Sequence, residues 1–197
     1  NSKRPVFYTG NGIRIAGAHE LFKKVSMQLG IPVVTGWNNQ DCIEDDNPLY
    51  VGRAGNMGDR PGNFAVQNAD LIFAVGSRLS IRQVGYNYKT WAREAYVMVC
   101  DVDAEELKKP SVHCDLPIHA NAKDLLCMMN EYLSKEGYGI SQSGLHDIHI
   151  GAKAPVLKTV FDGGEGLPGK NWLETCAYWK KRYPVYQDKF AASGADE

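Results

Sequence analysis

Short apolar runs alternate along the chain with longer stretches whose apolar residues recur at helical spacing. Uninterrupted apolar runs predict buried strands, because a strand covered on both faces shows no polar alternation. Such runs occupy residues 4–10, 31–36, 70–77, 96–103 and the shorter 117–120. Helices are predicted at 16–30, 60–69, 89–95, 121–136 and from 171 to a break at Pro184, whereas residues 37–57 are expected to be irregular.

This alternation predicts an α/β fold. We expect a three-layer, Rossmann-like parallel sheet with helices on both faces. Sheets of this kind bind ligands at the carboxyl ends of their strands. Polar and glycine residues gather at those ends, in segments 10–12, 35–36, 76–82 and 101–103. The sequence therefore predicts a ligand site along this edge of the sheet.

The character of the chain changes after Glu136. Residues 137–170 are rich in glycine and lack helical periodicity, which is typical of a linker or an extended arm. We therefore divide the chain into a domain of residues 1–136 and a tail of residues 137–197. The final helix carries Trp172, Cys176 and Trp179 on one face. That face needs a packing partner, and the partner can lie outside this chain.

Composition restricts the kind of partner. A formal net charge of −1 favours neither nucleic acid nor an anionic membrane surface. No apolar run approaches the roughly 18 residues of a membrane span. The five cysteines include no CxxC pair, which indicates unpaired thiols and a cytoplasmic setting. Cys100 and Cys127 are both expected to be core residues.

The motif Gly10-Asn11-Gly12 follows the first strand, where dinucleotide-binding folds carry G-x-G-x-x-G. Ile15 occupies the position of the third glycine, and the second strand ends in Thr35-Gly36 instead of an acidic residue. An NAD-type site is therefore disfavoured. A tight turn between strand and helix explains the two glycines equally well.

More specific signals follow the later strands. The segment 76–78 and Arg82 follow one buried strand, and guanidinium groups bind a diphosphate bidentately or stack on a flat ring. Asp101 and Asp103 follow the next strand, where carboxylates suit ribose hydroxyls. Each has an ordinary alternative, since the arginines can be solvated or salt-bridged and Asp103 can cap a helix. Together they favour an extended ligand that resembles an adenine nucleotide.

Four segments carry a resemblance to a known family. They are PVVTG, NPLYVGRAGNMGDRPGNFAVQNADLIFAVGSRLSIRQVG, VCDVDAEELKKP and CDLPIHANAKDLL. In this order they resemble the central domain of thiamine-diphosphate-dependent enzymes, and among these the catalytic subunit of acetolactate (acetohydroxyacid) synthase. The resemblance covers about residues 4–133. The family's H-P-L-x-x-G-x-x-G pattern is similar to Asn47-Pro48-Leu49 with Gly52 and Gly55.

The resemblance implies a three-domain parent, a homodimer or homotetramer that serves branched-chain amino acid biosynthesis. Its flanking pyrimidine-binding and diphosphate-binding domains would hold thiamine diphosphate and Mg²⁺. The parent would decarboxylate a 2-oxo acid such as pyruvate and ligate the acyl unit to a second carbonyl. The activating glutamate and the metal-binding GDG…N motif of the family belong to those flanking domains. The chain alone is therefore expected to be inactive, with no catalytic and no metal-binding residue of its own.

In acetolactate synthases the central domain binds FAD, which is not needed for net redox chemistry. The resemblance implies that the matching positions here bind the cofactor: Gly10, Asn11, Gly12, Thr35, Gly36, Asn56, Met57, Gly58, Asp59, Gly76, Ser77, Arg78, Arg82, Asp101, Val102, Asp103 and Asp115. Met57, Asp59 and Ser80 depart from the family's residues. The choice between FAD, ADP and no nucleotide stays open. The alternative is a structural central domain of another thiamine-diphosphate-dependent decarboxylase or carboligase without flavin.

Two further hypotheses fit the residues less well. Sirtuin-type proteins share the expected sheet topology, but their catalytic histidine context and their CxxC zinc pairs are missing here. His146, Asp147 and His149 could ligate a metal ion. They lie in the predicted linker, where solvent-exposed histidines are the expected case.

Overall fold

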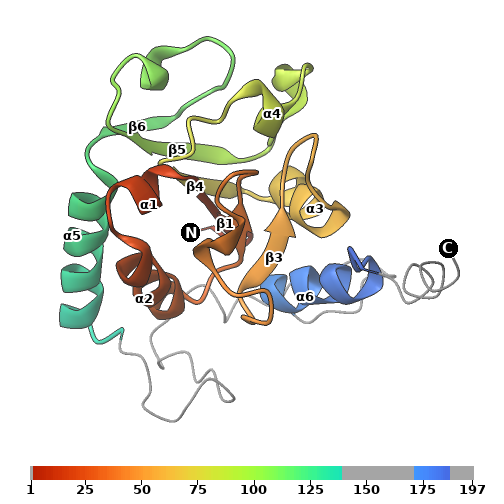
Figure 1. The fold of residues 1–197 in the computed structure, drawn as a ribbon, viewed down its shortest axis with the longest axis horizontal. Helices are drawn as coiled ribbons and strands as arrows, with labels where there is room; N and C mark the ends of the chain where they lie inside the picture. Colours follow the sequence, from red (N-terminus) through yellow and green to blue (C-terminus); the bar gives the residue numbers. More distant parts are fainter. Residues whose placement is uncertain (1, 139–170, 187–197) are drawn as a thin grey trace, which may run out of the picture.

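The computed structural model describes residues 2–138 and 171–186. Six strands form one sheet of order β3-β2-β1-β4-β5-β6, in which every neighbouring pair is parallel (Figure 1). The strands are β1 Pro5–Thr9, β2 Val33–Thr35, β3 Tyr50–Arg53, β4 Leu71–Val75, β5 Tyr96–Asp101 and β6 Leu116–His119. The predicted α/β fold with a parallel sheet is therefore confirmed.

Helices cover both faces of the sheet. They are α1 Gly12–Ile15, α2 His19–Leu29, α3 Arg60–Asn68, α4 Ile81–Val84, α5 Ala122–Lys135 and α6 Trp172–Arg182, and 3₁₀ helices occupy Gln40–Cys42, Tyr88–Thr90 and Glu106–Lys108. Helices α1, α2 and α5 lie over one face, and α3 and α6 lie over the other (Figure 1). The side chains of Asn121 and Asn171 cap α5 and α6, as their sequences predict.

The alternation of side chains along β1 explains the two cores. Phe7 points to the α2 side, where its ring lies 5.0 Å from that of Phe22 and 5.1 Å from that of Phe73. Val6 and Tyr8 point to the opposite face and belong to the second apolar cluster. All residues of β1 are buried. A strand apolar on both sides is what a sheet between two helix layers requires.

Two local predictions were wrong, and one short helix, α4, was not predicted. Strand β3 lies inside the segment expected to be irregular. It is short, lies at the edge of the sheet and carries Gly52 and Arg53, so its sequence lacks the long apolar run of the inner strands. Helix α4 is a single turn whose start is fixed by reciprocal hydrogen bonds between Ser80 and Gln83. The helix predicted at 89–95 is replaced by a 3₁₀ turn.

Helix α6 packs on this chain itself, so no outside partner is needed for its apolar face. The indole nitrogen of Trp172 donates a buried hydrogen bond of 2.9 Å to the carbonyl oxygen of Pro5. The ring of Trp179 lies 5.7 Å from that of Phe64 on α3 and 5.7 Å from that of Trp172. Cys176 is fully buried between them. The helix is therefore part of the outer layer that covers the sheet.

The five cysteines are free, as expected. Cys100 is buried, but Cys127 is only partly buried, so the prediction of a core position holds for Cys100 alone. The predicted linker and the candidate ligands His146 and His149 lie outside the described residues. The division of the chain at residue 136 stays a prediction.

Candidate functional site

The strand order reverses between β1 and β4, and a cleft opens at this point beside the carboxyl ends of the strands. Chain connections leave β1 toward β2 and β3 on one side and β4 toward β5 and β6 on the other. Ligands of doubly wound sheets bind at such a switch point. The cleft has a volume of about 440 Å³, which is within the usual range of ligand sites. Its lining includes seven predicted residues: Asn11, Gly12, Gly76, Ser77, Arg78, Asp101 and Val102.

The glycines at the floor of the cleft let two loops touch backbone to backbone. Gly12 N donates to Gly76 O at 2.9 Å, and Gly10 N donates to Val75 O at 3.0 Å. A Cβ atom on Gly10 would lie 2.1 Å from Ser77 Cα, and one on Gly12 would lie 2.7 Å from Gly76 Cα. These glycines therefore allow the β1 and β4 loops to approach each other, and Gly10 does so without lining the cleft.

Ser77 is a polar residue in the lining of this cleft. The residue is 7% exposed, and its Oγ atom is buried without a hydrogen-bond partner among the described residues. A buried hydroxyl without a partner costs free energy. A ligand oxygen or a bound water in the cleft would remove that cost, so Ser77 marks the cleft as a place for a polar ligand.

Two exposed apolar side chains also line the cleft. Ile15 at the end of α1 is 80% exposed and Val102 after β5 is 63% exposed. Large apolar side chains that face solvent in a concave site favour a flat or apolar ligand group. Ile15, which occupies the place of the third fingerprint glycine, therefore becomes part of the wall.

The carboxylates after β5 hold their own loop. Asp101 is 6% exposed, and its Oδ1 accepts a hydrogen bond of 3.0 Å from Asp103 N. Asp103 Oδ1 in turn accepts from Glu105 N at 2.9 Å. Asp103 thus holds the turn before the following 3₁₀ helix, but the cap position of that helix is Glu105, so the alternative interpretation of Asp103 as the helix cap was wrong. Asp101 remains at the cleft with a second carboxylate oxygen.

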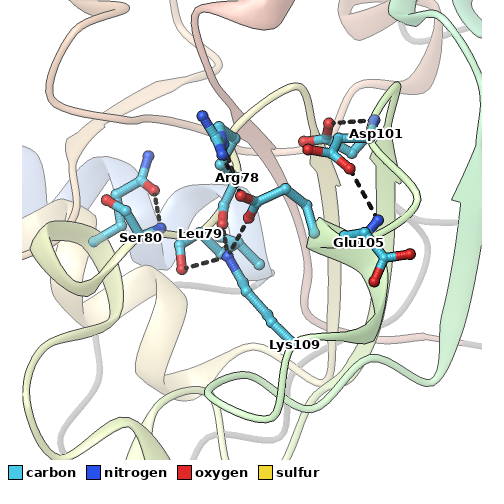
Figure 2. Close-up of polar contacts among 9 residues, drawn as sticks. Arg78, Leu79, Ser80, Asp101, Glu105 and Lys109 are labelled. Carbon is cyan, nitrogen blue, oxygen red and sulfur yellow. Dashed lines mark hydrogen bonds and ion pairs between the residues drawn. The ribbon is translucent and has the colours of Figure 1, made fainter.

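Arg78 is engaged by an ion pair. Its Nε donates to Glu106 Oε1 at 3.0 Å, and its Nη2 contacts the same oxygen. Figure 2 shows the ion pair together with Lys109, whose ammonium donates to the carbonyl oxygens of Arg78 and Leu79. The hydrogen bond from Arg78 holds the pKa of the Glu106 carboxyl below its ordinary value. The salt-bridged alternative for Arg78 is therefore the observed one.

Arg82 lies apart from this cleft, on the β2–β3 side. Its guanidinium stands 5.7 Å from the ring centroid of Trp37. Its carbonyl oxygen accepts a hydrogen bond of 2.9 Å from Asn56 N. Thr35 is fully buried beside Tyr50, with 3.4 Å between the two hydroxyl oxygens, and a Cβ atom on Gly36 would meet Gln83. This second group of predicted residues packs α4 against the ends of β2 and β3.

Asp59 acts as the cap of α3. Its Oδ1 accepts from Gly62 N and its Oδ2 accepts from Arg53 N, both at 2.9 Å. The neighbouring Gly58 lies against the Arg53 carbonyl, and Met57 is 58% exposed. The negative charge of Asp59 therefore faces the amide end of a helix, and it does not line the switch-point cleft.

Asp115 lies at the opposite end of the sheet. It precedes β6, and its Oδ2 accepts a hydrogen bond of 2.7 Å from Val97 N near the start of β5. The structure therefore does not bring Asp115 together with the other predicted site residues. Its carboxylate instead fixes the pairing of the last two strands.

A second groove of about 580 Å³ lies between β3 and α6, with Tyr50, Arg53, Lys180 and Tyr183 in its wall. Asp59 is the predicted site residue in this groove, and its carboxylate is occupied as described. None of the partnerless buried side-chain atoms found in the described segments belongs to this groove. The switch-point cleft is therefore the better candidate for a ligand site.

The described part of the chain contains no helix long and apolar enough to cross a membrane. Within residues 2–138 and 171–186, no cluster of three or more His, Cys, Asp or Glu side chains could hold a metal ion.

Residues 1–129 match the family model of the thiamine pyrophosphate enzyme, central domain. The matched segment is well over half of the chain. The chain belongs to this family. The resemblance drawn from the sequence is thereby confirmed, and the cleft described above is the switch-point cleft of a thiamine pyrophosphate enzyme central domain.

Several curated relatives of the chain are large subunits of acetolactate synthases. The chain is 34% identical over 126 residues to the probable acetolactate synthase large subunit of Methanococcus aeolicus, which covers 64% of this chain and 21% of the relative. It is 36% identical over 125 residues to the corresponding protein of Methanocaldococcus jannaschii, with coverage of 64% and 21%. It is 33% identical over 135 residues to the isozyme 3 large subunit of Escherichia coli, with coverage of 68% and 23%. The chain thus spans about a fifth of these relatives.

Sequence reasoning missed one wall of the central-domain cleft. This wall is formed by the start of α5, with Ala120, Asn121 and Ala122. Asn121 was recognised as a helix cap, and its Oδ1 does accept from Lys123 N at 2.8 Å. The signal that could have found it is topological, because α5 follows β6 and a helix after the last strand begins at the carboxyl edge.

Proposed function

We propose that this chain is the central domain of an acetolactate synthase-like enzyme that decarboxylates a 2-oxo acid and joins the acyl unit to a second carbonyl. The family membership and the relatives support this proposal. Thiamine diphosphate and Mg²⁺ would be held by flanking domains of the parent. The central domain would then contribute cofactor binding and assembly, and no catalytic group.

Within this proposal, the switch-point cleft takes the adenosine diphosphate portion of FAD. The observation that carries it is the buried, partnerless Oγ of Ser77, a residue in the lining of a cleft made by two glycine loops. Ser77 would donate to a phosphate or ribose oxygen, and the free oxygen of Asp101 would accept from a ribose hydroxyl. Ile15 and Val102 would enclose the base. When bound, FAD would supply a flavin ring, although the family's net reaction needs no electron transfer.

The departure at Asp59 does not oppose this ligand. Because both carboxylate oxygens accept backbone amides at the start of α3, the charge is already balanced by the helix end and lies outside the cleft.

A central domain without flavin is the second candidate, and one observation favours it. Arg78, the residue expected to meet the diphosphate, is bound by Glu106 in this structure. In a domain with a purely structural role, this ion pair would persist and no ligand would occupy the cleft. Solution binding separates the two candidates.

Titration of the 197-residue chain with FAD, followed by the change in flavin fluorescence, tests the proposal. Saturable binding is expected. Ser77→Ala should weaken it about three- to tenfold, the worth of one neutral hydrogen bond. Ser111→Ala is the matched control, since Ser111 does not line the cleft. Absence of saturable binding by a chain with intact circular dichroism would favour the domain without flavin.

The remaining expectations, a homodimeric or homotetrameric parent with a cytoplasmic location, belong to the same proposal. Sedimentation of the full parent enzyme tests the assembly. Fluorescence microscopy of the tagged parent tests the location.

A further inference from the structure

The Arg78 guanidinium is held by one carboxylate at the mouth of the cleft. Nε and Nη2 both contact Glu106 Oε1. The Arg78 side chain is nevertheless 67% exposed, whereas that of Glu106 is 17% exposed. The carboxylate is therefore the more buried member of the pair, and the guanidinium lies at the surface.

A second cation fixes the carboxylate and the loop together. Lys109 Nζ donates to Glu106 Oε2 at 2.9 Å and to Leu79 O at 3.3 Å, and it also donates to Arg78 O. Arg78 and Leu79 have φ angles of 57° and 41°. The backbone of a residue other than glycine rarely adopts this left-handed conformation, which persists where surrounding contacts hold it. Lys109 and Glu106 therefore keep the β4 loop in the shape that forms the cleft wall.

Other carboxylates near Arg78 do not take the place of Glu106. Asp101 and Asp103 attract the guanidinium through space, but each uses an oxygen for a backbone amide of its own loop. Among the described residues, Glu106 alone forms an ion pair with Arg78. Its carboxylate thus satisfies the same guanidinium donors that an anionic ligand in the cleft would use.

We propose that Glu106 is the residue that determines how tightly this cleft binds a diphosphate. The Glu106 carboxylate occupies the guanidinium donors that a ligand's phosphate would use. A diphosphate can therefore bind Arg78 only by displacing this carboxylate. The ligand class is a nucleoside diphosphate or a dinucleotide with a diphosphate bridge. This inference rests on the proposed nucleotide function of the cleft. Glu106 acts through Arg78 and is a positioning residue.

The size of the effect follows from the exposure of the pair. A partly exposed ion pair is worth up to about 1 kcal/mol, so its removal as a competitor corresponds to roughly a fivefold gain in affinity. A carboxylate close to a bound diphosphate also repels it. The combined expectation for Glu106→Gln is roughly a five- to tenfold tighter binding of a diphosphate. A ligand without phosphate does not compete with Glu106 for Arg78, so its affinity should be the same for the variant and the unmodified chain.

Calorimetric titration of the 197-residue chain with ADP, inorganic diphosphate and adenosine tests this inference. Glu106→Gln should bind ADP and inorganic diphosphate five- to tenfold more tightly and leave adenosine unchanged. Glu105→Gln is the matched control, because it removes the same charge from an adjacent residue that pairs with Lys108. It should alter each affinity less than twofold. The gain should disappear in the double variant Glu106→Gln, Arg78→Met, a readout that a merely structural role of Glu106 would not produce.

The outcomes distinguish this inference from the proposed function. If Glu106→Gln gains nothing for ADP and diphosphate, or gains equally for adenosine, the inference is overturned even where the unmodified chain binds FAD. If FAD and ADP fail to bind but diphosphate binds the variant more tightly through Arg78, the inference stands and the nucleotide proposal falls. If no probe binds either protein, both are overturned. Glu106→Asp replaces the glutamine variant if the latter unfolds, with a smaller gain of the same sign expected.

Discussion

Replacement of Asp59 by alanine should lower stability and leave the cleft unchanged. The carboxylate accepts two backbone hydrogen bonds, from Gly62 N and Arg53 N, and the side chain is only 9% exposed. Loss of the helix cap costs about 1 kcal/mol. The Arg53 amide, left partly buried without an acceptor, costs about 1–3 kcal/mol. We therefore expect a loss of about 2–4 kcal/mol in the free energy of unfolding.

Urea unfolding followed by circular dichroism measures this loss. With a denaturant slope of about 2 kcal/mol per M, the midpoint should fall by about 1–2 M. Asp59→Asn keeps one acceptor and should lose less, while Asp46→Ala, at an exposed position in the preceding loop, serves as the control. A midpoint shift below about 0.2 M for Asp59→Ala would refute the capping role. Weakened FAD or ADP binding at unchanged stability would show instead that Asp59 contacts the ligand.

Three further predictions concern the fold. Burial would raise the pKa of Asp70, but hydrogen bonds from the Ser2 hydroxyl and two backbone amides outweigh it and hold the pKa below its ordinary value. The stability that Asp70 contributes is therefore present above its unfolded pKa near 4 and is lost as the pH falls through the lower folded pKa. The urea midpoint of the Asp70→Asn variant should therefore depend less on pH between about pH 4 and pH 2 than that of the unmodified chain. Trp179→Ala should cost about 3–5 kcal/mol in the same unfolding assay, because α6 packs through this ring, and a loss below about 1 kcal/mol would mean that α6 is not docked. Burial raises the pKa of the Cys42 and Cys100 thiols to about 11, so iodoacetamide at pH 8 should leave both unmodified in the folded chain, and rapid labelling located by mass spectrometry would contradict the burial.

Most of the fold could be predicted because the inner strands are apolar on both faces. β1, β4 and β5 lie in the middle of the sheet, and their sequences show the uninterrupted runs that such burial requires. β3 escaped detection because an edge strand of four residues needs only a short apolar segment. The docking of α6 could not be predicted, because periodicity identifies an apolar face but does not tell which surface covers that face.

Within the site, strand-end position could be predicted but hydrogen-bond partners could not. The cleft contains Ser77 and Asp101, both found from their places after buried strands. Asp59 and Asp115 also stand near strand ends, yet their carboxylates are used by backbone amides. A sequence motif shows which polar groups are near an edge. Whether a group is free depends on which backbone amides the folded chain brings to it, as it brings Val97 N to Asp115.

The two arginines four residues apart show how this difference bears on function. Arg78 follows β4 closely and lines the cleft, where its charge is compensated by Glu106 from the 3₁₀ helix after β5. Arg82 lies one turn later, in α4, and stands over the Trp37 ring on the β2 side. A single extended ligand that met both guanidiniums would have to run from the β5 side of the sheet to the β2 side and displace Glu106 on the way. An adenosine diphosphate portion in the cleft would need Arg78 alone, so the second arginine would matter only for a ligand as long as FAD.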